Sequence, residues 1–487
     1  MLATRNLSSP TSLLLKRGFI TGASLLGLVA LLILGSIPAA WLDRPQDLPP
    51  VPVAKSYVLD NVHTLDVEHG KLNRHQQLTI RAGRITAIQP AGAAADPALT
   101  VIDGAGRYVT PGLTDMHVHL YDRKDLLLNL AYGVTSVRNL RGLPMHLRWR
   151  QELRQQQWLG ANLYTASPVL DGPRYAHALQ QVVRSPDHGR ALVKRYKAMG
   201  YDLIKAYGYL PDDILQAVLA EAKASNIPVA KHGPFQFSDL PVQALAGLQS
   251  LEHVEDIFQG PLNYQFDQAL LRTAIEQLRQ IDPVITPTLA TFNQLTEISD
   301  KKLAYVETLP LARFNRFFRE LNELYVINRW LDAKREQADW NIKERDFLFT
   351  IVRELDSAGI RLLVGSDAGT LYLTAGLATH EEMQLLQQAG LSPARVIQAA
   401  TINAARAMGI DANNGSIAVG KIADLVLSSH SPLEDVTGLQ TPSAVIKQGH
   451  WLAEADLERL KKSGENPSHW YPSLGRLLED ILSRLLH

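Results

Sequence analysis

The sequence predicts an α/β protein: a (β/α)8 TIM barrel, a small β-sandwich domain built from both flanks, and a transmembrane segment at the N-terminus. Three observations predict this architecture. Eight apolar, strand-like runs alternate with helical patterns, as parallel βα units require. Shorter strand-like stretches precede and follow these runs. A long uncharged stretch lies near the start of the chain.

The composition is that of a folded protein with a large core. Of the 487 residues, 46% are hydrophobic and 20% are charged, which excludes a globally disordered chain. Lys+Arg and Asp+Glu both number 49, so the net charge gives no reason to expect nucleic acid as a partner. There is no cysteine, which excludes disulfides and thiolate chemistry. A metal ion would have to bind histidine or carboxylate.

The stretch from Phe19 to Trp41 contains 23 residues without a charge, and about 20 such residues span a bilayer. Lys16 and Arg17 precede it, which places residues 1–18 on the cytoplasmic side under the positive-inside rule. We expect a single-pass membrane anchor with an exported (periplasmic or extracellular) catalytic domain. The alternative is a signal that is cleaved to leave a secreted protein. Residues 42–54 follow as a Pro-rich linker.

Residues 55–110 and 411–455 alternate between apolar and polar side chains, with Gly, Pro and Asn between the runs. This pattern predicts the two halves of the β-sandwich domain. Residues 456–487 are predicted to contain a C-terminal amphipathic helix, because apolar residues recur there at i, i+3, i+4 and i+7. That helix could dock on the body, pair with another subunit of a homo-oligomer, or lie on the membrane.

The barrel is predicted over residues 111–410. Its eight strand-like runs are 114–120, 133–139, 161–167, 202–207, 228–232, 250–254, 284–289 and 361–367. The connection from the seventh run to the eighth, about 290–360, is abnormally long and has Leu, Phe, Arg and Glu at helical spacing. We interpret it as a helical insertion over the barrel mouth that shapes a substrate pocket, with a plain packing excursion as the alternative.

Six ionisable side chains lie in or at the ends of five of these runs. The C-terminal ends of barrel strands meet at one mouth, so these side chains should lie together. The first two are i and i+2 in one run and therefore share a face of the strand. Each residue alone has an ordinary structural explanation, but the coincidence over five strands favours a metal site. The six are His117, His119, Lys205, His232, His253 and Asp367.

These motifs resemble the amidohydrolase superfamily of metal-dependent hydrolases over about residues 55–455. "VTPGLTDMHVHL" is the most specific motif, and "GVTSVRN", "LIKAY", "LEHVEDI" and "LLVGSDAG" follow in the same order. Within the superfamily the chain is most similar to the imidazolonepropionase-like and Xaa-Pro dipeptidase-like group. It departs from that group at Asn139, where an acidic residue is commoner, and at Val254, where glycine is usual.

The resemblance implies a binuclear metal centre. His117, His119 and Asp367 would bind one ion, and His232 and His253 would bind the second. Zn²⁺ suits these imidazole and oxygen ligands, with Mn²⁺ or Co²⁺ as alternatives.

The resemblance also implies chemical roles. Lys205, carboxylated by carbon dioxide, would bridge the two ions together with a hydroxide that attacks the scissile carbonyl. Asp367 would move the proton to the leaving amine. Tyr207 would hydrogen-bond the substrate or its carbonyl, and Arg138 would either touch the substrate or stabilise the barrel.

The expected activity is hydrolysis of a C–N amide bond in a small-molecule or peptide-like substrate, such as a dipeptide or an acyl-amino acid. One alternative is a mononuclear deaminase or cyclic-amide hydrolase of the same superfamily, which metal stoichiometry would distinguish. Another, from a different class, is a catalytically silent, membrane-tethered binding protein. The intact set of six candidate ligands argues against that last alternative.

Overall fold

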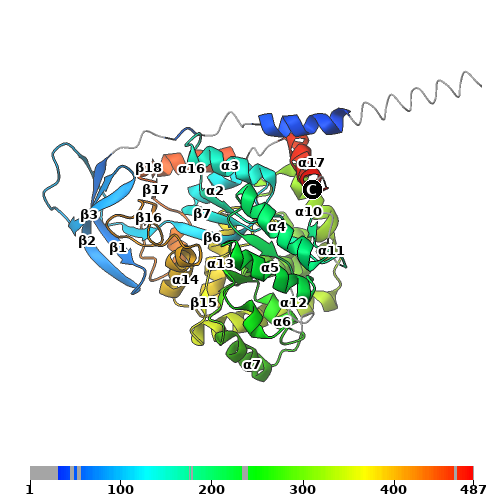
Figure 1. Ribbon diagram of the computed structural model, residues 1–487. Helices are drawn as coiled ribbons and strands as arrows, with labels where there is room; N and C mark the ends of the chain where they lie inside the picture. The colour runs from blue at the N-terminus through cyan, green and yellow to red at the C-terminus, as the bar shows by residue number, and fades with distance from the viewer. Residues whose placement is uncertain are drawn as a thin grey trace, which may run out of the picture. The chain divides into compact units, whose positions relative to one another are not determined.

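The computed structural model describes residues 31–43, 49–51, 56–174, 176, 179–232, 240–465 and 469–485 (Figure 1). The chain divides into two compact units. The smaller contains Met1–Gln46 and Ser468–His487, and the larger contains Asp47–Pro467.

Eight parallel strands of the larger unit coincide with the eight predicted runs. They are β6 (Leu113–Val118), β7 (Val134–Asn139), β8 (Asn162–Thr165), β11 (Ile204–Ala206), β12 (Val229–Lys231), β13 (Ser250–Glu252), β14 (Val284–Thr286) and β15 (Arg361–Leu362). Strands β6 to β8 form one sheet. Strands β11 to β15 form another, together with the short β9 (Leu170–Asp171) and β10 (Gln181–Val182).

Single parallel bridges link these two sheets at both edges. One joins Ala166, just after β8, to Leu203, just before β11. The other joins Val118 of β6 to Ala368, a few residues beyond β15. The predicted α/β, TIM-barrel-like fold is therefore confirmed, and the ends of the strands lie at a common mouth.

Helices connect successive strands of this unit. They are α2 (Arg123–Ala131), α3 (Pro144–Arg154), α4 (Pro186–Met199), α5 (Asp212–Ala224), α6 (Glu255–Gln259), α7 (Gln268–Arg279), α13 (Leu377–Gln388), α14 (Pro393–Ala400) and α15 (Ile402–Ala407). A 3-10 turn, η2 (Val242–Leu245), precedes β13.

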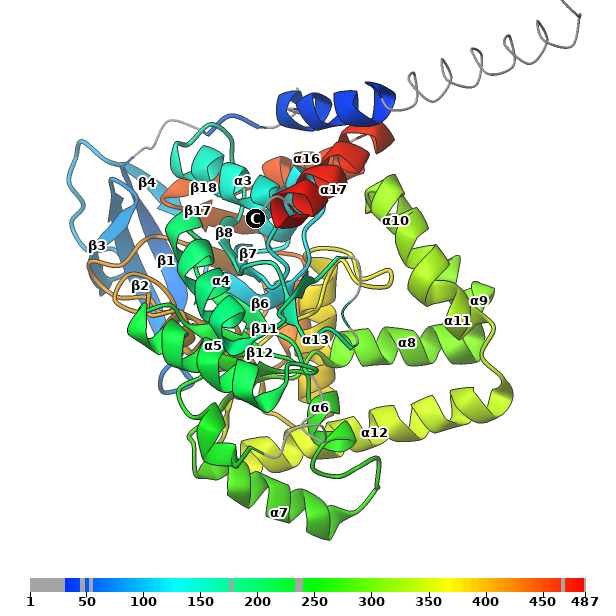
Figure 2. The same cartoon turned by 45° about the vertical axis from the view of Figure 1, so that its right-hand side comes forward.

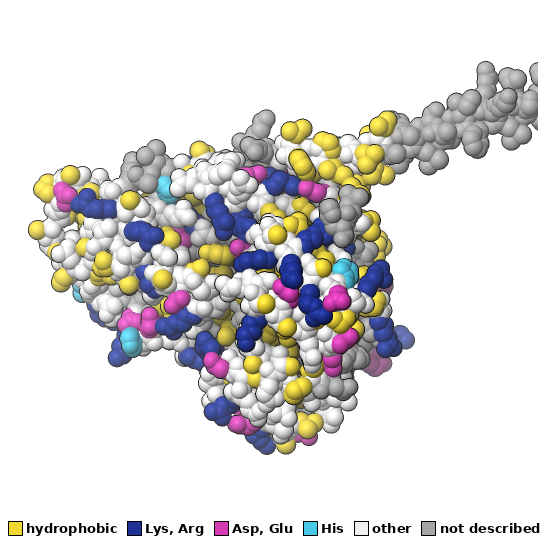
Figure 3. Space-filling view, in the orientation of Figure 1, with side chains coloured by type: hydrophobic (Ala, Val, Ile, Leu, Met, Phe, Trp, Pro, Cys, Tyr) yellow, Lys and Arg dark blue, Asp and Glu magenta, His cyan; other side chains and the backbone are white. Residues whose placement is uncertain are grey.

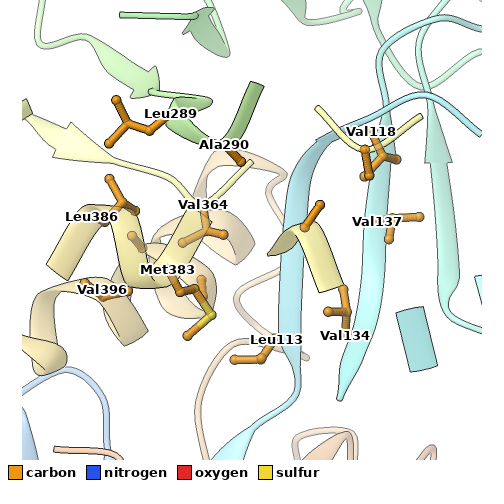
Figure 4. Close-up of a cluster of buried hydrophobic side chains, with 14 of the residues drawn as sticks. Leu113, Val118, Val134, Val137, Leu289, Ala290, Val364, Met383, Leu386 and Val396 are labelled. Carbon is orange, nitrogen blue, oxygen red and sulfur yellow. The ribbon is translucent and has the colours of Figure 1, made fainter. Parts of the chain in front are cut away.

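A large hydrophobic cluster holds the strands against these helices (Figure 4). Leu113 and Val134 lie on β6 and β7, and Met383 and Val396 lie on α13 and α14; all four are fully buried. Burying such side chains stabilises the fold by about 1.5–3 kcal/mol each. The core therefore fixes the strands whose ends carry the candidate site.

The connection between β14 and β15 is mostly helical. It contains α8 (Leu289–Lys301), α9 (Leu303–Val306), η3 (Leu311–Arg313), α10 (Arg316–Asn322), the π-helical turn η4 (Glu323–Ile327), α11 (Asn328–Leu331) and α12 (Arg335–Ser357). Helices α8 and α12 run side by side (Figure 2), and Asn341 Nδ2 donates to Ser299 Oγ at 3.0 Å between them. This pair supports the shorter helices α9 to α11.

A third sheet, of eight strands, combines both flanks of the barrel-like unit. Its strands are β1 (Tyr57–Asp66), β2 (Lys71–Arg81), β3 (Arg84–Pro90), β4 (Thr100–Asp103), β5 (Tyr108–Pro111), β16 (Leu425–Ser428), β17 (Ala444–Lys447) and β18 (His450–Ala453). The order is β18-β17-β16-β5-β1-β2-β3, with β4 paired to β1. The two flanks meet where β5 pairs antiparallel with β16, with Thr110 opposite Val426. A 3-10 turn, η5 (Val436–Leu439), lies between β16 and β17.

Residues 456–487 were expected to contain one amphipathic helix, but the structure has two. Helix α16 (Glu454–Gly464) belongs to the larger unit and α17 (Trp470–Leu485) to the smaller. Gly464 ends α16, and Pro467 follows in the sequence.

The smaller unit pairs α17 with a helix over residues 31–42. Tyr471 Oη donates to the carbonyl of Leu32 at 2.7 Å, and the buried Arg476 forms an ion pair with Asp43. The 31–42 helix carries exposed apolar side chains, including Leu31 and Leu42. Hydrophobic side chains gather over this helix in the space-filling view (Figure 3).

The predicted transmembrane stretch is only partly described. Its residues 19–30, the predicted cytoplasmic region 1–18, and linker residues 44–48 and 52–54 lie outside the described residues. Within the described part of the chain, no helix has the length and apolar character needed to cross a bilayer.

Candidate metal centre

Five rings form a continuous row at the mouth of the barrel-like unit. The ring centroids of His119 and His117 lie 5.4 Å apart, those of His117 and His253 4.6 Å, and those of His253 and His232 4.1 Å. Tyr207 extends the row, with its ring 4.3 Å from that of His232. The structure thus brings together four predicted histidine ligands and the predicted tyrosine, which come from β6, β11, β12 and β13 or from the residues just after them.

Asp367 joins the first two histidines. Its Oδ1 lies 2.9 Å from His119 Nε2 and 3.4 Å from His117 Nε2. One ligand atom from each of these three residues falls within 4.8 Å of the others. A single cation can contact ligands at that spacing.

The hydrogen bonding of His117 shows which of its ring nitrogens carries a proton and therefore what can lie between His117 and Asp367. Its Nδ1 lies 2.8 Å from Glu252 Oε2, and a carboxylate can only accept, so Nδ1 carries a proton. Burial lowers the pKa of His117 to about 4, although Asp367 and Glu252 oppose the shift. The ring is then neutral and its Nε2 is an acceptor. Two acceptors facing each other repel unless a cation lies between them, so the donor set fits a divalent metal.

Lys205 lies on β11 and is only 2% exposed. Its Nζ is one of the buried side-chain atoms of the described residues that have no hydrogen-bond partner, as are His119 Nδ1 and His232 Nδ1. Burial lowers the pKa of Lys205 to about 8. A buried amine without a partner is costly unless it is neutral or modified.

Glu252 was not predicted from the sequence, yet it organises the centre. Its carboxylate binds His117 through Oε2 and Arg138 Nη2 through Oε1, the latter at 2.7 Å. Arg138 is fully buried and also donates to the carbonyl of Met116 at 2.7 Å and to Ser250 Oγ at 2.8 Å. Of the two roles expected for Arg138, this placement favours support of the barrel over contact with substrate.

Two threonines and one aspartate also hold the proposed ligands. His253 Nδ1 lies 2.6 Å from Thr288 Oγ1, and Thr291 Oγ1 donates to Asp367 Oδ2 at 2.9 Å. Asp115 accepts from the backbone nitrogen of His117 at 3.1 Å. These bonds leave Asp367 Oδ1 directed at the histidines and fix the rings around it.

The backbone is strained at two of the proposed ligands and at a residue that contacts one of them. His253, Thr288 and Asp367 have φ angles of 69°, 55° and 58°, in the left-handed region. Non-glycine residues persist there only when their surroundings impose the conformation, and such residues cluster at functional sites. This conformation also explains why Glu252 was missed. Regular strand alternation would place Glu252 and His253 on opposite faces, but the turn at His253 brings both to the centre. An acidic residue inside an otherwise apolar run was the available signal.

A pocket adjoins the centre at His119. It is lined by residues that follow β6, by residues 368–375, and by the η3–α10 part of the insertion. The helical insertion therefore reaches the candidate site, through Phe314 and Phe318 among others.

Comparisons with known proteins agree with this fold. A family model described as the amidohydrolase family matches residues 300–452. Imidazolonepropionase from Symbiobacterium thermophilum is 40% identical over 68 residues, 13% of this chain and 16% of that protein. The chain spans only 14% and 16% of the lengths of two curated relatives that it matches.

Solved structures cover more of the chain. Bottromycin amidohydrolase superposes with a TM-score of 0.69 at 26% identity, covering 91% of this chain and 96% of that one. A Xaa-Pro dipeptidase with bound methionine in the active site shares the fold, with a TM-score of 0.63 at 18% identity and coverage of 82% and 100%. The fold and these matches make the chain similar to amidohydrolases over most of its length, and residues 300–452 match the family model.

Proposed function

We propose that the protein hydrolyses a C–N amide bond in a small peptide-like substrate, a dipeptide or an N-acyl amino acid. The observation that carries this proposal is the approach of Asp367 Oδ1 to Nε2 of both His117 and His119, at 3.4 and 2.9 Å respectively. The likeness to an amidohydrolase and to a Xaa-Pro dipeptidase supports it.

The proposed ligands form two sets. His117, His119 and Asp367 would hold one cation, and His232 and His253 a second. Zn²⁺ suits these donors best, with Mn²⁺ and Co²⁺ as alternatives. Bound divalent cations would lower the pKa of a water molecule and polarise the scissile carbonyl.

Lys205 is proposed to bridge the two sets as a carbamate. Since burial lowers its pKa to about 8, a useful fraction of the amine is neutral near neutral pH. The neutral nitrogen can attack carbon dioxide, forming an N–C bond and releasing one proton. The anionic product supplies oxygen donors and replaces a buried amine that has no hydrogen-bond partner.

Asp367 and Tyr207 are the proposed catalytic residues. Thr291 Oγ1 donates to Asp367 Oδ2 and orients the carboxylate, which would take a proton from the attacking water and pass it to the leaving amine. Burial raises the pKa of Tyr207. Its hydroxyl therefore stays protonated and can donate to the carbonyl oxygen of the substrate.

A mononuclear deaminase or cyclic-amide hydrolase is the second candidate. The tight three-ligand group of His117, His119 and Asp367 and the local identity to imidazolonepropionase favour it. Elemental analysis of the purified protein separates the two candidates, followed by a screen of dipeptides, N-acyl amino acids and cyclic amides. Two metal ions per chain and dipeptide turnover support the first. One ion and turnover of cyclic amides alone would refute it.

We also propose attachment to a membrane through the N-terminal stretch, with the catalytic unit exported. The uncharged residues 19–41 and the exposed apolar side chains of the 31–42 helix support this. Fractionation tests it: the full chain should stay with membranes at high salt and alkaline pH and leave them only in detergent. Mass measurement of the mature N-terminus distinguishes a retained anchor from a cleaved signal.

A further inference from the structure

The pocket beside His119 is not used by the chemistry described above. One wall consists of Ala368 and Gly369, next to Asp367, and of His119 itself. The opposite wall comes from the insertion, with Phe314 and Phe318. A substrate held at the metal centre would therefore have part of its structure next to this pocket.

The pocket is built mainly from aromatic and aliphatic side chains. Phe318 stacks on Tyr121 with ring centroids 4.2 Å apart and an angle of 16° between the planes. Phe314 packs edge-on against Tyr372 at 6.2 Å, and Leu120 and Leu373 complete the apolar lining. Stacked rings offer a flat apolar surface with little flexibility.

Four polar side chains of the lining are bonded to other parts of the protein. Arg313 Nη1 donates to Tyr132 Oη at 2.8 Å. Asn322 Nδ2 donates to the carbonyls of Gly369 and Leu371 at 3.2 and 3.3 Å.

The same is true of Asn315 and Asp125, whereas the hydroxyl of Thr374 has no hydrogen-bond partner among the described residues. Asn315 Nδ2 donates to Asp122 Oδ2 at 3.1 Å. Asp125 Oδ2 accepts from the backbone nitrogens of Tyr121 and Asp122 at 3.0 and 2.9 Å. A charged group entering this pocket would lose its hydration, and the neutral hydroxyl of Thr374 would compensate that loss poorly, which is unfavourable.

Phe318 is held in position by its local structure. It lies on α10, where the side chain of the N-cap residue Asn315 accepts from the backbone nitrogen of Phe318. The bond from Asn315 to Asp122 ties the start of α10 to the segment after β6. The π-helical turn η4 follows α10 directly, a feature that is frequent at functional sites.

We propose that this pocket binds an uncharged, apolar side chain of the substrate residue that flanks the scissile amide, and that Phe318 and Tyr121 determine this specificity. This inference rests on the proposed amide hydrolysis. It assigns the insertion a definite role, because Phe318 of α10 is the ring that stacks on Tyr121.

The test uses the metal-loaded full-length protein and a panel of dipeptides and N-acetyl amino-acid amides that differ only in one side chain: Ala, Leu, Phe, Lys or Glu. The wild type should show kcat/KM at least about tenfold higher for Leu or Phe than for Lys or Glu. Phe318→Ala should lower kcat/KM for the Leu and Phe substrates about 10- to 100-fold and change the Ala substrate little. Metal content should stay at the wild-type level.

Two control variants distinguish the loss of the Phe318 ring from a folding defect and from a general effect of altering the insertion. Phe318→Leu keeps an apolar side chain and should retain part of the preference. Tyr325→Ala removes an aromatic ring of the same insertion that is 76% exposed, and should leave the preference unchanged. A wild-type preference for Lys or Glu, or an unaltered preference in Phe318→Ala, would overturn the proposal.

If the protein is not an amide hydrolase at all, the pocket proposal can still be tested separately. If the wild type hydrolyses no member of the panel, calorimetric titration with N-acetyl-leucine and N-acetyl-lysine tests the pocket by binding alone. Tighter binding of N-acetyl-leucine, lost in Phe318→Ala, would support the pocket while the amide hydrolase proposal fails. Equal binding of the two compounds would overturn the pocket proposal as well.

Discussion

Glu252 accepts a buried hydrogen bond from His117, with 2.8 Å between Oε2 and Nδ1. The two residues come from β13 and β6, which are distant in sequence. Arg138 binds the other oxygen of the same carboxylate at 2.7 Å and holds it in place. A residue across the barrel-like unit therefore decides which nitrogen of His117 faces the candidate metal site.

Replacing Glu252 should weaken metal binding without removing a ligand. Glu252→Gln keeps an acceptor for His117 but loses the charge, so the imidazole becomes a poorer donor. We expect metal affinity to fall about 10- to 100-fold, measured by competition with a chromogenic chelator. Asp96→Asn, at an exposed ion pair with Arg81, is the control and should bind metal normally. Unchanged affinity in folded Glu252→Gln would contradict this role.

Lys205→Ala should abolish amide hydrolysis and lower the bound metal, because it removes the proposed bridging group. Formate or acetate should restore part of the activity by supplying carboxylate oxygens in the space of the lost side chain. Lys231→Ala removes a buried lysine of the neighbouring strand and should keep the metal content of the wild type. Full activity of Lys205→Ala would eliminate the carbamate proposal.

The stability of the protein should fall as pH rises through the titration of Glu382. This side chain is fully buried, accepts from the backbone nitrogen of Ala290 at 2.7 Å, and has its pKa raised by burial to about 8. Between the ordinary pKa of 4.5 and about 8, the folded protein keeps a proton that the unfolded chain has lost. Raising the pH over this range therefore lowers the free energy of unfolding.

Urea unfolding at pH 5 and pH 8 measures this effect. The decrease between the two pH values should be larger in wild type than in Glu382→Gln by several kcal/mol, since each pKa unit corresponds to about 1.4 kcal/mol. The exposed Glu458→Gln should behave like wild type. Equal pH dependence of wild type and Glu382→Gln would show that Glu382 ionises normally.

The pairing of the 31–42 helix with α17 can be tested by cross-linking, because the chain has no cysteine of its own. Leu32→Cys and Tyr471→Cys should be joined by a short bismaleimide in the intact protein, as a peptide map would reveal. Adding Gly475→Leu should prevent this, since even a Cβ at Gly475 would lie 1.9 Å from the backbone oxygen of Ser36. A cross-link that persists after this third substitution would argue against the close packing of the two helices.

Sequence pattern predicted the strands and the ring cluster because both follow from regular geometry. Apolar runs of strand length, separated by helical patterns, placed His232 and Asp367 at strand ends, and strand ends of such a fold converge. Residues that orient the ligands were harder to find. Glu252 and His253 both face the centre because the backbone turns to positive φ at His253, and Thr288 also has positive φ; residue periodicity does not encode such turns.

The eight-stranded sheet, which pairs β5 with β16, affects how the chain folds while the ribosome is still making it. Thr110 and Val426, which face each other across β5 and β16, are 316 residues apart in the chain. While the ribosome is still making the intervening segment, the early strands have an unsatisfied edge that can recruit other polypeptides. Such distant pairing slows folding. A nascent chain of this protein should therefore depend on chaperones until its last 60 or so residues emerge, and versions truncated before β16 should aggregate.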